Sequence, residues 1–424
     1  MIRSLLVALC FTLSFNLLTA GDKEVIDSLH LVLNNSTGIN RVNVLNRLSE
    51  LKIDSDLEQA GHLAQVAVDV ANEEDYPEGK AIAYKNLAIF FAKKNNGDSS
   101  TFAYLSALNY YESTNKLNEI ASIYNSLGIT LMNAGRYSES LDYLVKGLVL
   151  RQQLGNNIKI GGSYCNMGIV MEYLHEPKQA LGYYLKSYEY LKGGENQRYL
   201  SNVLMNIGVV NFTLGNYRKS NEFYSEALVI QIQNDDRYGL MNLYMNLGNL
   251  SMKTKDLSAA IVYHNMSLTI AKELGDRKSI SGTYINLGDV YSNKMGMHEK
   301  GLEYLEKGLK IAKTVHNKEW ENTAYRAIAE THYITKNFEK AYLLEKQYAT
   351  LNDSLVKANA KLQIVKSKAV LQMQRDKLQE NYKKLAESDK GQVTADNRLL
   401  IVVGCSGFLI LVLLVLYLKE KRHL

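Results

Sequence analysis

The sequence predicts an all-α fold, a solenoid of helix-turn-helix repeats in which each repeat contacts only its neighbours. A five-residue phrase, Tyr284-Ile285-Asn286-Leu287-Gly288, returns along the chain with a period of 40 residues. A period between about 20 and 50 residues is typical of solenoids. The glycines that close the phrase are Gly128, Gly168, Gly208, Gly248 and Gly288.

Each repeat is expected to be a helical hairpin. Within the phrase, the aromatic residue, the aliphatic residue and the glycine stand at i, i+3 and i+4, which share one face of a helix. A glycine inside a helix costs roughly 1 kcal/mol relative to alanine, so its repetition indicates the close approach of a second helix. That second helix carries two rows of small residues, which are Ser140, Ala180, Ser220 and Ala260, then Gly147, Ser187, Ala227, Ser267 and, after a one-residue slip, Gly308.

This spacing resembles the tetratricopeptide repeat in its longer form, as found in kinesin light chain and in bacterial peptide-sensing regulators. The resemblance implies a right-handed α-solenoid whose concave groove binds a protein or a peptide. Seven repeats fit between about residues 81 and 350. A degenerate eighth repeat precedes them, with Val44 and Leu48 on its first helix, so the predicted solenoid covers residues 38–350.

The start of the chain has the features of an export signal. Residues 1–20 contain Arg3, an apolar run from Leu5 to Leu18, and the small residue Ala20 before a polar stretch. This layout is typical of a secretory signal peptide. Because Leu18 is large for its place three residues from the end of the signal, an uncleaved anchor remains an alternative. Residues 21–37 predict a short helix and a turn.

The segment after the solenoid changes character. Residues 351–398 predict a polar helix and a hinge, with a heptad line formed by Ile364, Leu371, Leu378 and Leu385. Such a line indicates either a coiled coil, which would give a homodimer through residues 351–386, or a single solvated helix. Residues 399–418 carry no charge, and this length suffices for a transmembrane helix. Residues 419–424 form a short basic tail.

These end segments predict where the protein is found. An export signal followed much later by one membrane span places the repeats outside the cytoplasm and the carboxyl terminus inside it. In a Gram-negative bacterium the repeats would then be periplasmic. The expected product is a single-pass membrane protein.

Composition and spacing exclude several classes of function. The net charge is 49 − 44 = +5 and is spread along the chain, which does not indicate nucleic-acid binding. The eight histidines and three cysteines show no metal-ligand spacing. No phosphate-binding loop and no pair of catalytic carboxylates stands out. We therefore expect no enzyme activity, no metal and no cofactor.

The informative set is a row of asparagines two positions before the end of the repeated phrase. Five of the seven repeats have asparagine there, and Ser126 and Ala327 are the exceptions. At about 100° per residue, this position points away from the face that packs on the second helix, so we expect it to face a groove. An asparagine offers both a donor and an acceptor, which together hold a peptide backbone amide, and the tetratricopeptide resemblance implies this role. The alternative is that duplication copied a neutral residue. The row consists of Asn86, Asn166, Asn206, Asn246 and Asn286.

Neighbouring positions on the same face suggest the character of the ligand. Met205, Met245 and Phe212 make the middle of the groove apolar and adaptable, whereas Asp289 makes one end acidic. An extended segment with a basic end would suit such a groove. The alternative for each of these residues is packing between repeats.

Two functions follow from this layout. The first is a membrane-anchored interaction module that recruits a protein or peptide outside the cytoplasm. The second is the sensing part of a signalling protein, because the order of segments is similar to the sensor regions of Bacteroidota membrane histidine kinases and helix-turn-helix regulators. In those proteins an output domain follows the span, and residues 419–424 leave no room for one, so we expect the first function.

Overall fold

The computed structural model describes residues 20–354, and every described element is helical. The chain divides into two units, residues 1–367 and 368–424, and all described residues belong to the first. The predicted signal peptide (1–20, apart from its last residue), the heptad segment beyond residue 354, the span 399–418 and the tail 419–424 lie outside the described residues. Within residues 20–354, no helix combines the length and the apolarity that a membrane crossing requires.

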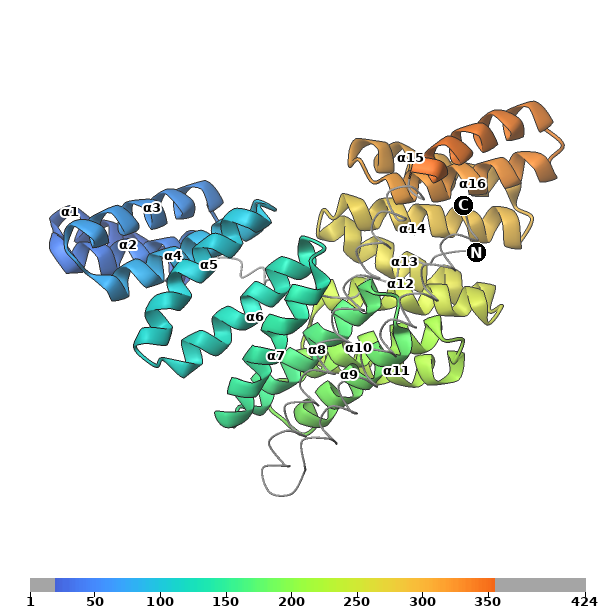
Figure 1. The fold of residues 1–424 in the computed structure, drawn as a ribbon. Coiled ribbons are helices and arrows are strands. Elements are labelled where there is room, and N and C mark those ends of the chain that lie inside the picture. Colours follow the sequence, from blue (N-terminus) through green and yellow to red (C-terminus); the bar gives the residue numbers. More distant parts are fainter. Residues whose placement is uncertain (1–19, 355–424) are drawn as a thin grey trace, which may run out of the picture. The chain divides into compact units, whose positions relative to one another are not determined.

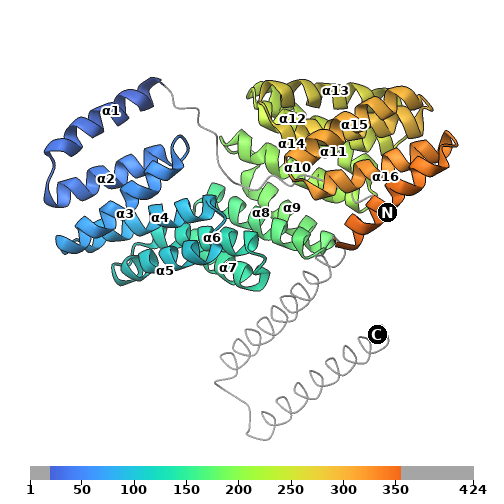
Figure 2. The same cartoon turned by 90° about the horizontal axis from the view of Figure 1, so that it is seen from above.

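Eight helical hairpins follow the N-terminal helix α1 (Ala20–Asn35) within the described range. Consecutive helices lie side by side in chain order (Figures 1 and 2). The first helices are α2 (Gly38–Lys52), α4 (Pro77–Lys93), α6 (Leu117–Asn133), α8 (Asn157–Tyr173), α10 (Gln197–Thr213), α12 (Arg237–Lys253), α14 (Arg277–Asp289) with its extension η1 (Val290–Lys294), and α16 (Lys318–Ile334). The second helices are α3 (Leu57–Glu73), α5 (Gly97–Ser113), α7 (Tyr137–Gln153), α9 (Pro177–Leu191), α11 (Tyr217–Gln233), α13 (Leu257–Glu273), α15 (His298–Thr314) and the helix at 338–354.

The repeated glycines let the two helices of a hairpin approach closely, which confirms the reason inferred for them. A Cβ atom added at Gly208 would lie 2.4 Å from the ring of Tyr224 on the second helix. One at Gly128 would lie 2.5 Å from Leu144, and one at Gly248 would lie 2.5 Å from the ring of His264. In each of these three hairpins, the bulky residue sixteen positions after the glycine therefore occupies the space that the glycine leaves.

The small residues on the second helices also form hydrogen bonds across the hairpin. Ser140 Oγ donates to the carbonyl oxygen of Gly128 at 2.6 Å, and Ser220 Oγ donates to that of Gly208 at 2.8 Å. At the other small position, Ser187 Oγ donates to the carbonyl oxygen of Gly161 at 2.7 Å. These hydroxyl groups are buried, and each of them is satisfied by a helix carbonyl that would otherwise have only its own helical partner.

The connections between helices repeat every 20 residues. The middle residue of each three-residue connection has a positive φ. These residues are 20 positions apart from residue 75 to residue 175, and again from residue 215 to residue 275. This left-handed residue ends a helix with the bonds of a C-terminal cap. At Gly155 (φ 70°) and Gly275 (φ 67°) glycine supplies this conformation, as the sequence indicates. Asp56 and Asp236 cap the following helices, since each accepts a hydrogen bond from a backbone N–H three residues later.

The one-residue slip before Gly308 is absorbed inside a helix. Helix α14 has 13 residues and the π-helical turn η1 adds 5, whereas α10 and α12 have 17 residues each. The backbone N–H of Met295 donates to the carbonyl oxygen of Val290, five residues earlier, at 3.0 Å. A π-turn takes up one extra residue without ending the helix, so the hairpin that follows keeps its packing.

Candidate functional site

The asparagines expected to line an open groove lie instead between neighbouring first helices. We call Asn46, Asn86, Asn166, Asn206, Asn246 and Asn286 the asparagine ladder. The first five are at most 3% exposed, and only Asn286 is half-buried. The prediction that this position faces a groove did not include this burial. It took account of packing on the second helix alone, whereas each first helix also contacts the first helices beside it, as α2 contacts α4 and α10 contacts α12.

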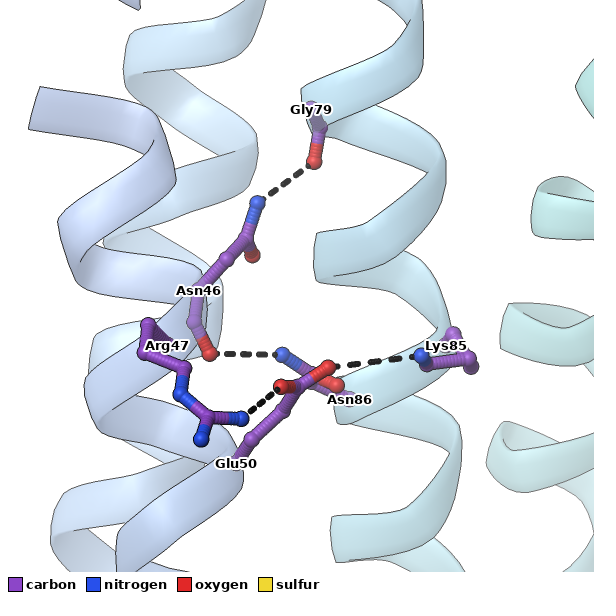
Figure 3. Close-up of polar contacts among 6 residues, drawn as sticks. All are labelled: Asn46, Arg47, Glu50, Gly79, Lys85 and Asn86. Carbon is purple, nitrogen blue, oxygen red and sulfur yellow. Dashed lines mark hydrogen bonds and ion pairs between the residues drawn. The ribbon is translucent and has the colours of Figure 1, made fainter. Parts of the chain in front are cut away.

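At the N-terminal end, the ladder amides bind backbone carbonyl groups (Figure 3). Asn86 Nδ2 donates to the carbonyl oxygen of Asn46 at 3.1 Å, and Asn46 Nδ2 donates to that of Gly79 at 2.9 Å. Beside them, Glu50 accepts hydrogen bonds from Lys85 at 3.3 Å and from Arg47 at 3.2 Å. The bonds made by Asn46, Asn86 and Lys85 join α2 to α4, whereas Arg47 and Glu50 both belong to α2. A shallow hollow of about 280 Å³ lies between these two helices and is lined by Ser49, Glu50, Ile53, Lys85, Asn86 and Ile89.

In the middle of the chain the ladder amides have fewer partners. Asn206 Nδ2 has only the weak acceptor Cys165 Sγ, at 3.7 Å, and its Oδ1 has no partner among the described residues. Neither the Nδ2 nor the Oδ1 of Asn246 has a partner in the described part of the chain. On either side of this pair the bonds return, since Asn166 donates to Asn125 Oδ1 at 3.0 Å and Asn286 donates to Asn249 Oδ1 at 3.2 Å.

The other residues expected to line the groove are mostly enclosed as well. Met205 is 0%, Met245 2% and Phe212 6% exposed, and Phe212 packs its ring against Tyr217 with 5.6 Å between centroids. These three side chains are enclosed within the array of helices. Asp289 is half-buried and accepts a hydrogen bond from Asn293 at 2.9 Å.

One charged residue beside the ladder was missed. Arg151, at the end of α7, is 7% exposed. Its Nη1 donates to Ser163 Oγ at 2.7 Å, to the carbonyl oxygen of Lys159 at 3.0 Å and to Asn125 Oδ1 at 3.0 Å. A signal was present in the sequence, because the equivalent positions, 23 residues after the repeat glycine, hold the uncharged residues Leu191, Gln231 and Ala271 in the next three hairpins. An arginine at a core position calls for a reason.

The central hairpins also enclose titratable side chains. Glu172 accepts a hydrogen bond from Tyr184, and burial raises the pKa of this carboxyl from 4.5 to about 7. His264 is fully buried against Gly248, and burial lowers its pKa from 6.5 to about 4. Neither ring nitrogen of His264 has a hydrogen-bond partner among the described residues. The Glu172 carboxyl and the His264 ring are therefore both uncharged in the folded chain between about pH 4 and pH 7.

A comparison with protein families matches the model described as tetratricopeptide repeat at residues 119–193 and 279–351. The matched segments begin in α6 and in α14, and each covers close to two of the hairpins described above. The chain is a tetratricopeptide repeat protein. The similarity predicted from the sequence is thereby confirmed for the repeats, and the comparisons do not show the kinase or regulator layout.

Solved structures similar to this tetratricopeptide array support the same fold. The apo form of the quorum sensor NprR from B. thuringiensis is 13% identical, with a TM-score of 0.63, over 78% of this chain and 92% of that chain. A signal transduction ATPase with a tetratricopeptide repeat sensor from Pyrococcus horikoshii is 16% identical, with a TM-score of 0.58, over 82% of this chain and 55% of that chain. A Rap protein complexed with competence and sporulation factor is 12% identical, with a TM-score of 0.55, over 79% and 93%. A search of curated proteins gave no match.

Proposed function

We propose that the chain is a protein-interaction module that holds an extended segment of another protein along its first helices. The observation that carries this proposal is the pair of ladder amides at Asn206 and Asn246, which are buried without adequate partners. A buried polar group left unpaired costs about 1–3 kcal/mol. Such a cost, placed on two adjacent first helices, is offset when a bound backbone supplies the missing donors and acceptors.

The side chains around this pair suit a surface that opens for a ligand. Met205 and Met245 precede the two asparagines by one residue and are enclosed in the absence of a ligand. Methionine side chains are unbranched and repack at little cost, so they are able to move aside and then cover an inserted segment. The Rap protein in complex with competence and sporulation factor gives a precedent for a ligand on a similar fold.

The test removes both amides at once. We expect Asn206→Ala with Asn246→Ala to weaken the bound partner by about 2–4 kcal/mol, because each lost amide leaves backbone groups of the partner unpaired. The fold should persist, since the only described hydrogen bond that these two side chains lose is the weak one to Cys165. The measurement is a pull-down from the native cell envelope, followed by titration of the recovered partner.

A matched control changes two exposed asparagines, Asn109→Ala with Asn133→Ala, which lie outside the ladder. This control should recover the same partners as the unaltered chain. If the ladder double variant also recovers them at the same level, the ladder does not bind the partner and the proposal fails.

The proposed module is anchored in a membrane, with its repeats outside the cytoplasm. The support for this part is the sequence alone, namely the signal-like residues 1–20 and the uncharged residues 399–418. Protease added to intact spheroplasts should digest residues 124–350. Complete protection of these residues, together with digestion after lysis, would place the repeats inside the cell.

A sensor is the second candidate, favoured by the likeness to a signal transduction ATPase that carries a tetratricopeptide repeat sensor. A sensor must transmit binding through residues 351–398, whereas a tether need not. Insertion of three or four residues near Lys390 should leave partner binding unchanged if the segment is a tether. An output that varies with the helical period of about 3.6 residues would favour the sensor.

A further inference from the structure

The turn between η1 and α15 carries two exposed methionines. Met295 is 44% and Met297 is 45% exposed, and they flank Gly296. No other connection between the described helices contains a methionine. Among the other methionines of the described range, only Met266 is comparably exposed. Single exposed apolar side chains are normal on a protein surface, whereas two of the same kind on one turn indicate a shared role.

The backbone of this turn is held in place on both sides of the glycine. Gly296 has a φ of 71°, a left-handed conformation that glycine adopts without strain. The backbone N–H of Met295 donates to the carbonyl oxygen of Val290 at 3.0 Å, and that of Met297 donates to the carbonyl oxygen of Tyr291 at 2.8 Å. The two side chains therefore start from a fixed turn, directly after a π-helical segment of the kind often found at functional sites.

A histidine with one bonded ring nitrogen follows the two methionines. His298 is the first residue of α15 and is half-buried. Its Nδ1 forms a hydrogen bond of 3.4 Å with Ser292 Oγ, which in turn lies 2.6 Å from Thr331 Oγ1, and both hydroxyl groups belong to buried residues. No hydrogen bond to Nε2 is present among the described residues. A partner on one ring nitrogen orients the imidazole so that the other nitrogen can bind a metal.

The three side chains are close enough to share one ion. Consecutive Cα atoms are about 3.8 Å apart, so those of Met295 and Met297 are at most about 7.6 Å apart, and His298 is the next residue. Methionine has three rotatable side-chain bonds. Both sulfur atoms can therefore reach an ion held by the imidazole without any change of the backbone.

The donor atoms of this turn favour a soft metal ion. Thioether sulfur is a soft ligand that prefers Cu(I), whereas zinc prefers thiolate, imidazole or carboxylate ligands. Within residues 20–354, no group of three or more histidine, cysteine, aspartate and glutamate side chains is placed to hold a metal ion. The expectation of no metal was based on histidine and cysteine spacing and did not include methionines.

We propose that Met295, Met297 and His298 bind one Cu(I) ion through two thioether sulfurs and one imidazole nitrogen. All three donors are uncharged when they bind, which favours a soft monovalent ion over a divalent one. The exposure of both methionines leaves the site open to copper from the surrounding solution. This inference does not depend on the proposed function.

The test adds Cu(I) to the purified full-length chain without oxygen, in competition with bicinchoninate, whose Cu(I) complex is coloured. The three cysteines are replaced by alanine for this titration, because thiolates also bind Cu(I). We expect one ion per chain. Met295→Leu with Met297→Leu, and separately His298→Gln, should each weaken binding by at least about tenfold, since even the loss of a group that only orients a ligand costs about 10–100-fold.

The matched control is Met266→Leu, which removes an equally exposed methionine from α13. This variant should bind Cu(I) as tightly as its parent. A second measurement leaves the cysteines in place. In the unaltered chain labelled with ¹³C at the methionine methyl groups, Cu(I) should shift the resonances of Met295 and Met297 and leave that of Met266 unchanged.

Three results would overturn the proposal. If the double methionine variant binds Cu(I) as tightly as the control, the two thioethers are not ligands. If only His298→Gln weakens binding, a lone imidazole holds the ion. If Cu(I) shifts the methyl resonance of Met266 as much as those of Met295 and Met297, exposed methionines bind copper singly and the turn is not a site.

Discussion

Two pairs of neighbouring first helices differ in how their asparagines are bonded. One pair is α2 with α4, and the other is α10 with α12. Both pairs carry an asparagine at the same position of the repeat, and in both it is buried. Between α2 and α4 the amide of Asn86 joins one helix to the other through a backbone carbonyl. On α10 and α12 the amides of Asn206 and Asn246 lack such partners.

This difference teaches that an asparagine at the same position of the repeat has one of two effects, depending on whether its amide is paired. Where a paired asparagine bridges two helices, it contributes to the stability of the array. Where the asparagine is enclosed and unpaired, it lowers the stability of the free chain, and its amide donor and acceptor remain available to a ligand.

The largest effect is expected at the central glycine Gly208. At the equivalent position the N-terminal hairpin α4–α5 already has Ala88. A Cβ atom at Gly208 would lie 2.4 Å from the Tyr224 ring, which is fully buried. We expect Gly208→Ala to lower the free energy of unfolding by about 3 kcal/mol, the upper part of the range for overpacked cores, as measured by urea denaturation.

The control for that substitution is Gly182→Ala on α9. Gly182 is exposed, and a Cβ atom there would meet nothing within 4 Å. This variant should be neutral or stabilised by up to about 1 kcal/mol, because alanine is the better helix former. Equal losses at Gly182 and Gly208 would mean that helix propensity, and not close packing, explains the glycine row.

The ladder itself gives the next prediction, a difference of about 1–3 kcal/mol between two variants. Asn86→Leu should destabilise the chain, because it leaves the Asn46 carbonyl oxygen without its amide donor. Asn246→Leu should be neutral or stabilising in the free chain, since it removes a buried amide with two unpaired atoms. Thermal melting of both variants without ligand checks this. The comparison between the two helix pairs fails if Asn246→Leu is the more destabilising change.

Stability of the central hairpins should depend on pH through two opposing groups. Glu172 has a raised pKa, about 7, so its contribution is present below 4.5 and is lost as pH rises toward 7. His264 has a lowered pKa, about 4, so its contribution is present above 6.5 and is lost as pH falls toward 4. Between pH 4.5 and 6.5 the two dependences oppose each other, each with a slope of at most about 1.4 kcal/mol per pH unit.

Single variants separate the two groups. Glu172→Gln should leave a chain that loses stability as pH falls from 6.5, and His264→Leu should leave one that loses stability as pH rises from 4.5. Leucine fits the second site, because Leu144 stands there in another hairpin. Urea midpoints at several pH values, taken relative to the unaltered chain, check both signs. Identical pH profiles for the two variants would contradict the assignment.

The smallest effect is expected at the surface of the N-terminal pair. Glu50 bridges Arg47 and Lys85, and all three side chains are at least about a third exposed. Exposed ion pairs contribute about 0–1 kcal/mol. Glu50→Gln should therefore cost less than about 1 kcal/mol, and high salt should remove the difference. A larger, salt-independent loss would mean that Glu50 supports the hollow through packing.

The sequence was sufficient for the fold because its strongest signal is local and repeated. The glycine row, the small rows and the slip before Gly308 all correspond to contacts within one hairpin. The burial of Asn206 was not predictable from the angle counted on one helix, because it depends on the neighbouring first helix. The register of Arg151 marks a core position in the sequence, but its bonds to Asn125, Lys159 and Ser163 depend on how α6, α7 and α8 pack together.

The backbone of this array repeats every 20 residues over much of its length, whereas the side chains repeat every 40. The turn within a hairpin and the turn between hairpins both contain a residue in the left-handed conformation. The backbone alone therefore does not determine which of its two neighbours a helix pairs with. The glycine row makes the distinction, because only the partner within the repeat fits against it. We therefore expect the main competing species during synthesis to be hairpins shifted by one helix, which refolding kinetics would report as a slow phase that grows in Gly208→Ala.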